Sequence, residues 1–167
     1  YWSVLCTCEG EVVYKDQKFS IQHIGAFEYG RAINFSYLPL AFFTHQIINL
    51  ANNRQLVLMQ LRDSFNRILQ SRLYLRDASN GTVQMFDQNV HFKVHRVYPK
   101  VKTPNGHSMY LPREFEWRYL GKDGYALSVQ AQSRGDFKFG LAAGYVGSFK
   151  YQVKINNEEQ EGESGYC

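Results

Sequence analysis

Short runs in which every second residue is apolar, separated by turn signals, constrain this chain more than any other feature. In residues 90–96, Val90, Phe92 and Val94 alternate with charged residues and histidines, which is the two-residue period of a strand. Asn80-Gly81, a strong signal for a two-residue turn, follows another such run. Repetition of this pattern along the chain predicts roughly nine or ten strands joined mostly by short turns.

Eleven stretches with strand character, from which the nine or ten strands are expected, cover most of the sequence. They are residues 11–14, 18–24, 43–49, 55–63, 68–76, 82–86, 90–96, 115–120, 125–132, 137–141 and 143–155. Residues 101–112 contain two prolines and a glycine and are expected to form a long loop. Residues 46–72 also show a helical period, but the interruption at Asn52-Asn53 and the β-branched content favour strands there.

Length and composition favour one all-β domain spanning residues 1–167. The chain is long enough to bury a core, and 16% of its residues are aromatic, a class that favours pleated surfaces. Short connections imply antiparallel neighbours, so we expect a mostly up-and-down barrel, because closure removes exposed sheet edges. The interior of such a barrel is either packed with side chains or holds one apolar ligand.

Charge and cysteine content exclude several other classes. Lys and Arg number 19 against 15 Asp and Glu, without a clustered basic face, so nucleic-acid binding is not expected. Cys6, Cys8 and Cys167 give an odd count, which argues against a disulfide framework. With no signal-peptide pattern and no long apolar run, a cytoplasmic location is favoured.

The stretch from Ile24 to Asn49 holds the candidate chemistry, because acidic, basic and histidine side chains alternate there with aromatic ones. Glu28 is a candidate general acid if it is buried, since desolvation raises a carboxyl pKa. The alternative for Glu28 is a structural ion pair with Arg31. His45 is a candidate catalytic partner, or else a satisfied interior polar group.

Several aromatic residues are candidates for lining a pocket, with core filling as the alternative. The ligand-binding candidates are Tyr29, Arg31, Phe43, Trp117 and Tyr145, with Tyr37 a further aromatic of this kind. No nucleophile, Walker or dinucleotide motif is present. Nor is a metal expected, because His91 and His95 on one strand would lie about 13 Å apart.

The spaced glycines and aromatics resemble a known barrel module. Trp2, Gly10, Gly25-Ala26-Phe27-Glu28-Tyr29, the strand carrying His45 and the closing stretches 144–151 and 162–166 carry this resemblance. They are similar to the lipocalin-like superfamily that includes carotenoid 1,2-hydratase, the fungal Diels–Alderases and the survival-factor lipid-binding proteins. Members usually contain two barrels, and this sequence does not begin with Met. We therefore expect a C-terminal barrel whose partner is a second barrel in cis or a homodimer mate.

The resemblance implies a cofactor-free site for a small hydrophobic molecule. We expect binding of a lipid or polyene-like ligand in the barrel interior. Hydratase-type members tend to carry an Asp-His-Asn cluster where this chain has Glu28-Tyr29-Gly30-Arg31, so the local histidine and amide are missing. A cofactor-free hydratase or isomerase using Glu28 is the first alternative, and a structural half-barrel acting through an interface is the second.

Overall fold

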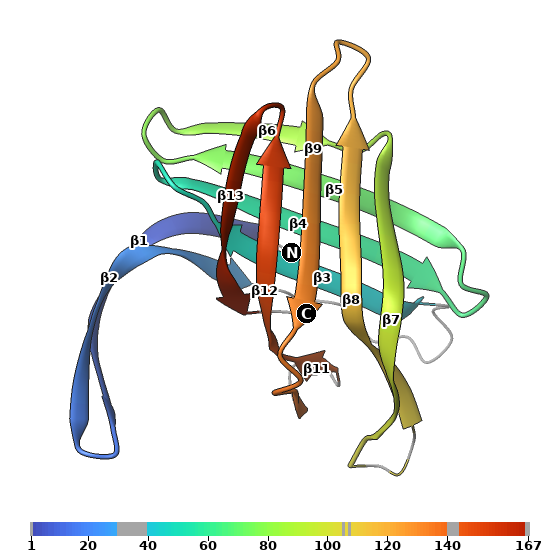
Figure 1. Cartoon of the computed structure of the whole chain (residues 1–167), viewed down its shortest axis with the longest axis horizontal. Helices are drawn as coiled ribbons and strands as arrows, with labels where there is room; N and C mark the ends of the chain where they lie inside the picture. Colours follow the sequence, from blue (N-terminus) through green and yellow to red (C-terminus); the bar gives the residue numbers. More distant parts are fainter. Residues whose placement is uncertain (1, 30–39, 105, 107, 140–143, 166–167) are drawn as a thin grey trace.

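The protein is built from antiparallel strands, as expected from its alternation. The computed structural model describes residues 2–29, 40–104, 106, 108–139 and 144–165, and within them all regular secondary structure is β (Figure 1). The all-β, antiparallel prediction is confirmed. The helical alternative for residues 46–72 is wrong, since this region forms three antiparallel strands.

Thirteen strands occur in the described part of the chain. They are β1 (Trp2–Tyr14), β2 (Gln17–Tyr29), β3 (Leu40–Asn49), β4 (Arg54–Asp63), β5 (Ile68–Asp77), β6 (Thr82–Phe86), β7 (Val90–Lys102), β8 (Ser108–Leu120), β9 (Ala126–Ser133), β10 (Lys138–Phe139), β11 (Tyr145–Val146), β12 (Ser148–Ile155) and β13 (Glu158–Gly165).

The turns follow from their sequences. Asn52 and Asn53 between β3 and β4 have φ values of 58° and 57°, and Lys15 and Asp16 between β1 and β2 have 48° and 61°. Two successive left-handed residues match the right-handed twist of a hairpin, and asparagine and aspartate tolerate this conformation better than most residues. Gly81, with φ 69°, serves the turn from β5 to β6.

Two sheets enclose the core. A four-stranded sheet in the order β3-β4-β5-β6 packs against a five-stranded sheet in the order β13-β12-β9-β8-β7, and Figure 1 shows their strands crossing steeply. The inward side chains of both sheets fill the space between them, led by Trp117, Phe115, Phe149 and Leu58. Trp117 donates from Nε1 to Gln46 Oε1 at 2.5 Å, which links the sheets through a buried hydrogen bond.

The described strands form separate hydrogen-bonded sheets, not one closed barrel. The two sheets do approach at one side, where β13 lies beside β3 and the Ser164 hydroxyl donates to the Ile47 carbonyl oxygen. Nearby, Tyr151 Oη donates to the Asn49 carbonyl oxygen at 2.7 Å. Side-chain hydrogen bonds, and not a continuous sheet, therefore join the two sheets at this corner.

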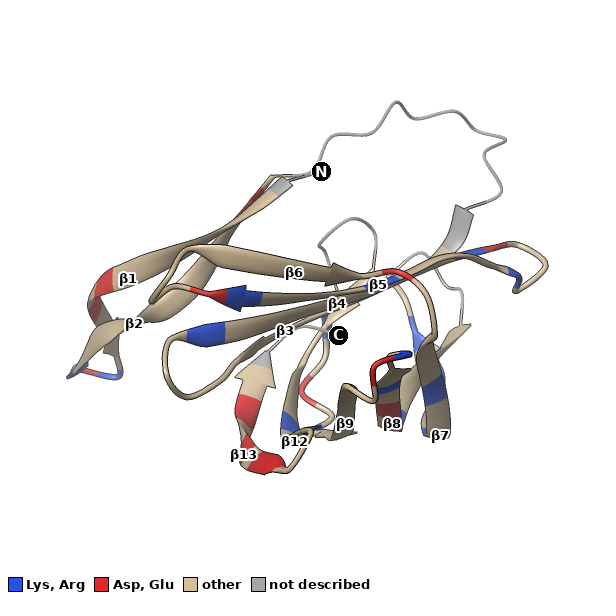
Figure 2. Ribbon diagram, turned by 90° about the horizontal axis from the view of Figure 1, so that it is seen from above, with Lys and Arg blue, Asp and Glu red and all other residues tan. Residues whose placement is uncertain are grey.

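The β1–β2 hairpin forms a third element on the outside of the four-stranded sheet. Its root, around Glu28 and Ser3, packs on the outward side of β3 to β5, whereas every residue from Glu9 to His23 is exposed. Figure 2 shows the hairpin extending away from the body of the two sheets. The hairpin is thus anchored at one end only.

Several strands begin or end at other residues than the sequence predicts. The expected loop over residues 101–112 is mostly strand, because β7 continues to Lys102 and β8 begins at Ser108. A bulge between Tyr98 and Val101, with Lys100 at φ 53°, accommodates Pro99 in β7, an edge strand that tolerates proline. Of the strand expected over residues 137–141, β10 retains Lys138–Phe139, and residues 140–141 lie outside the described part.

The strand expected over residues 143–155 is interrupted. Asp136 accepts hydrogen bonds from the Ser148 backbone nitrogen at 2.9 Å and from the Ser148 hydroxyl at 2.6 Å, and β11 and β12 separate at Gly147. Residues 158–165 form β13, although alternation did not predict a strand there and only the resemblance of residues 162–166 to the barrel module pointed to it. Its backbone pairs with β12 while its glutamate side chains remain solvated.

Asp63 provides a test of the turn between β4 and β5. Its buried carboxylate accepts hydrogen bonds from the backbone nitrogens of Phe65 and Arg67 and from Arg67 Nε. Burial raises the pKa of Asp63, but the hydrogen bonds from Arg67 and Phe65 outweigh it and hold the pKa below its usual value.

We expect Asp63→Asn to lower the melting temperature at pH 7. A depressed carboxyl pKa contributes stability above the unfolded-state pKa of about 3.9, and this contribution is lost as the pH falls through the folded-state value. The difference in melting temperature between wild type and variant should therefore shrink in acid. Asp87→Asn, at an exposed position, is the control, and an equal effect of both variants would contradict the assignment.

Candidate functional site

A row of buried and half-buried polar side chains on the outward side of the four-stranded sheet is hydrogen-bonded to the root of the hairpin. Asn49, Gln55 and Arg76 are direct cross-strand neighbours on β3, β4 and β5. Gln55 Nε2 donates to Asn49 Oδ1 at 2.8 Å, and Arg76 donates to Gln55 Oε1 at 3.2 Å. The two ends of the row bind the hairpin: Asn49 Nδ2 donates to the Ile24 carbonyl oxygen, and Arg76 donates to Ser3 Oγ.

The hairpin root brings Glu28 against His45. Glu28 projects from β2 towards the sheet, and its Oε1 lies 3.4 Å from His45 Nε2 on β3. The His45 side chain is 5% exposed and that of Glu28 18% exposed. The imidazole therefore lies behind the carboxyl group, and the carboxyl group retains access to solvent.

Electrostatics favour a neutral imidazole in this pair. Burial lowers the pKa of His45, the Glu28 carboxyl group opposes this effect, and the positive charge of Arg76 adds to it, so that the pKa lies below its usual value. Phe43, two residues before His45, stacks on the imidazole with a ring-centroid distance of 5.5 Å. A neutral, oriented histidine beside a carboxyl group can hold that group in place or exchange a proton with it.

A hollow of about 430 Å³ opens on the other side of Glu28. It lies where β2, β3, β4 and the end of β13 meet, and its lining residues are Gly25, Ala26, Glu28, Ile47, Asn49, Gln55 and Ser164. The lining thus combines small and apolar residues with one carboxyl group, two amides and one hydroxyl group. This volume lies within the roughly 300–1,000 Å³ of small-molecule sites.

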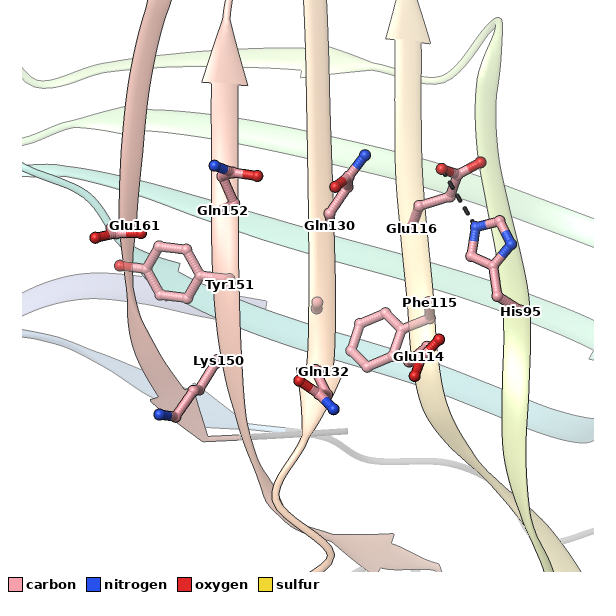
Figure 3. A pocket seen from close by; sticks show the side chains of 11 residues that line it. His95, Glu114, Phe115, Glu116, Gln130, Gln132, Lys150, Tyr151, Gln152 and Glu161 are labelled. Carbon is pink, nitrogen blue, oxygen red and sulfur yellow. Dashed lines mark ion pairs between the residues drawn. The ribbon is translucent and has the colours of Figure 1, made fainter.

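A second hollow, of about 570 Å³, lies on the outward side of the five-stranded sheet (Figure 3). Its buried carboxyl group, Glu116, pairs with His95 at 3.3 Å and with Arg118 at 3.0 Å. Burial raises the pKa of Glu116, but hydrogen bonds from His95 and Arg118 outweigh it and lower the pKa. The carboxylate is held ionised by its partners, which makes it unsuitable as a general acid at neutral pH.

Within the described residues, no group of three or more His, Cys, Asp and Glu side chains is arranged to hold a metal ion. The same part of the chain contains no helix with the length and hydrophobicity of a membrane span. Cys6 and Cys8 are free, half-buried thiols on one side of β1.

Comparison with solved structures supports a lipocalin-like fold. An AttH-like protein of Nitrosomonas europaea superposes with a TM-score of 0.61 at 15% identity, over 96% of this chain and 49% of that protein. Kievitone hydratase of Nectria haematococca superposes with a TM-score of 0.59 at 14% identity, over 94% of this chain and 48% of the hydratase. The chain therefore spans about half the length of each structure. At these identities the likeness shows the fold alone.

A family model, described as a family of unknown function (DUF6670), matches residues 1–167. The chain belongs to this family. No curated protein matches the sequence.

The fold brings together part of the expected site. Glu28, His45 and Phe43 are in contact or stacked, whereas Arg31 and Tyr37 lie outside the described residues. Tyr29, at the root of the hairpin, is about half exposed. Glu28 pairs with His45, which comes from a different strand.

The other two lining candidates lie elsewhere. Trp117 is fully buried between the sheets, on the opposite side of the four-stranded sheet from His45, so its alternative role as core filling applies. Tyr145 is on β11, where its hydroxyl group donates to the Lys102 carbonyl oxygen at 2.6 Å. His91 and His95 lie on the outward side of the five-stranded sheet, and His95 pairs with Glu116.

Four residues of the candidate site in this DUF6670 chain were not predicted from the sequence. Asn49, Gln55, Arg76 and Ser164 come from four strands, and no spacing in the sequence connects them. One signal was present: Gln55 and Arg76 occupy outward positions of β4 and β5, where a polar residue would be ordinary on a solvated face. Their burial depends on the hairpin root, which covers them.

His45 yields a test of the electrostatics. An imidazole whose folded-state pKa is lowered binds fewer protons than in the unfolded chain, so it costs stability as the pH falls below its unfolded value of about 6.5. We expect the stability of wild type relative to His45→Gln to decline between about pH 7 and pH 5. Urea unfolding across this range is the measurement. His91→Gln, at an exposed position, should leave the pH profile unchanged, and a matching change there would refute the assignment.

Proposed function

We propose that the protein binds a small hydrophobic ligand bearing a hydroxyl group in the hollow beside Glu28, without a cofactor. The observation that carries this proposal is the access of the Glu28 carboxyl group to a hollow that also has apolar lining. Ala26 and Ile47 supply apolar contact, and a carboxylate accepts a hydrogen bond from a hydroxyl group. Apolar lining with a few convergent polar groups is typical of small-molecule sites.

The packing of the core supports a site outside the space between the sheets. Trp117, Phe115 and Phe149 are at most 2% exposed and occupy that space, and the rings of Phe115 and Phe149 meet edge to face at a centroid distance of 5.6 Å. A ligand there would have to displace them. The expected location in the barrel interior is therefore replaced, in our proposal, by the hollow at the hairpin root.

Ligand retention tests the proposal. We expect native mass spectrometry of the purified protein to detect a bound apolar molecule, or saturable binding of retinol as a polyene-alcohol probe. Glu28→Gln should weaken probe binding about ten-fold or more, because hydrogen bonds to charged groups contribute roughly 1.5–3 kcal/mol. Ala26→Leu, which fills the hollow, should weaken binding further.

Glu114→Gln is the matched control, since this partly exposed carboxyl group is also ion-paired, with Arg96, but lies on the other sheet. Circular dichroism would establish that each variant folds. A protein that carries no ligand and does not take up the probe would contradict the proposal. Equal affinity of wild type, Glu28→Gln and Ala26→Leu would also contradict it.

A cofactor-free hydratase is the second candidate function, favoured by the Glu28–His45 contact and by the fold shared with kievitone hydratase. The local sequence around Glu28 lacks the histidine and amide of the hydratase-type cluster. His45 and Asn49 of β3 provide both groups near Glu28 in the folded protein. In such a reaction, Glu28 would protonate one alkene carbon, water would add to the other, and the proton released from that water would return to the carboxylate.

Isotope labelling separates an enzyme from a carrier. A hydratase should add one labelled water to the extracted ligand in H₂¹⁸O, and Glu28→Gln should abolish this addition. His45→Gln should reduce it, because the imidazole positions the carboxyl group. A ligand that is recovered unlabelled from wild type would rule out hydration of that ligand and leave the binding function.

A further inference from the structure

The projecting part of the β1–β2 hairpin has one apolar and one mainly polar side. By strand alternation and the β1–β2 register, the side chains of Val12, Tyr14, Phe19 and Ile21 lie on one side, together with Val4 nearer the root. These five residues are 41–61% exposed. We call them the apolar hairpin face. The opposite side of the same segment carries Glu9, Glu11, Ser20 and Gln22.

This division is what an antiparallel sheet shows when one side packs and the other meets water. An isolated two-stranded hairpin is at best marginally stable in water. Here both strands have 13 residues, yet every residue from Glu9 to His23 is exposed. Contiguous exposed apolar residues on a projecting ribbon mark an interaction surface.

The centre of the apolar hairpin face is shallow. Cys6, Cys8, Gly10 and Gly25 occupy the same side between Val4 and the tip residues, and the exposed His23, opposite Cys8, is the larger residue among them. The Cys8 sulfur lies where a Cβ atom on residue 25 would be, so Gly25 is needed for this packing. Small residues between larger ones form a saddle that lets another backbone approach closely.

The length of the solved neighbours indicates what covers this face. Both contain about as much chain again beyond the half that this chain matches, with coverage of 49% and 48%. Charged residues lie at the tip of the hairpin: Lys15 and Asp16 form its turn, and Glu11 and Lys18 pair at 3.5 Å on the side opposite the apolar hairpin face. An apolar centre with a polar rim is the usual anatomy of a protein–protein interface.

We propose that the apolar hairpin face docks on a second domain of similar size, carried on the same polypeptide. Tyr14 and Phe19 are the anchoring aromatics, and the saddle at Gly10 and Gly25 receives a strand or edge of that domain. This interaction is independent of ligand binding beside Glu28, because the apolar hairpin face and Glu28 lie on opposite sides of the hairpin.

Site-specific cross-linking in the product of the whole gene tests this proposal. A benzophenone amino acid at Tyr14 or Phe19 should cross-link to residues outside 1–167 of the same polypeptide. The same group at Val83, which is 62% exposed on β6, is the control and should give much less product. Mixing isotopically light and heavy protein distinguishes cross-links within one polypeptide from those between two copies.

A second measurement uses charge. Phe19→Asp in the whole gene product should increase protease cleavage between the two domains several-fold, whereas Val83→Asp should not. Cross-links that join hairpins of two copies, or cross-linking at Tyr14 and Phe19 no greater than at Val83, would overturn the proposal. A gene product without a second domain would also overturn it.

Discussion

The hydrogen bonds along Asn49, Gln55 and Arg76 connect the hairpin to the rest of the molecule. These three side chains are polar, and they occupy the outward side of the four-stranded sheet, which would normally face water. The hairpin root covers all three. Buried polar groups require partners, because leaving one unsatisfied costs about 1–3 kcal/mol. The row meets this requirement by bonding to Ile24 and Ser3, and these bonds fix where the hairpin lies.

The position of Glu28 depends on this attachment. A carboxyl group on a free hairpin would be solvated, and His45 would lie on an exposed side of β3. With the root in place, His45 is buried, Arg76 is close enough to lower its pKa, and Glu28 lies between the imidazole and the hollow. The proposed binding site and its electrostatics thus both arise from packing a two-stranded element on the outside of a sheet.

The space between the sheets has a different role from the one expected of a ligand-binding barrel. Large aromatic side chains fill this space. Trp117 donates the only N–H group of its side chain to Gln46 of the opposite sheet. Such a core stabilises the domain and leaves recognition to its outer surfaces. The hollow at Glu28 and the apolar hairpin face are two of these surfaces, and they lie on opposite sides of the same ribbon.

The sequence by itself determined the strands and most of their turns, because alternation and turn residues act over a few positions. Asn52-Asn53 and Asn80-Gly81 marked hairpins that the structure contains, and Glu28 and His45 were identified as residues with possible chemistry. Only the tertiary structure decided that they meet, that Arg76 influences them and that Trp117 is core. The reason is physical: these relations depend on which side of a sheet another element covers, and the two-residue period of a strand is the same whether a polar side is left in water or buried beneath a hairpin.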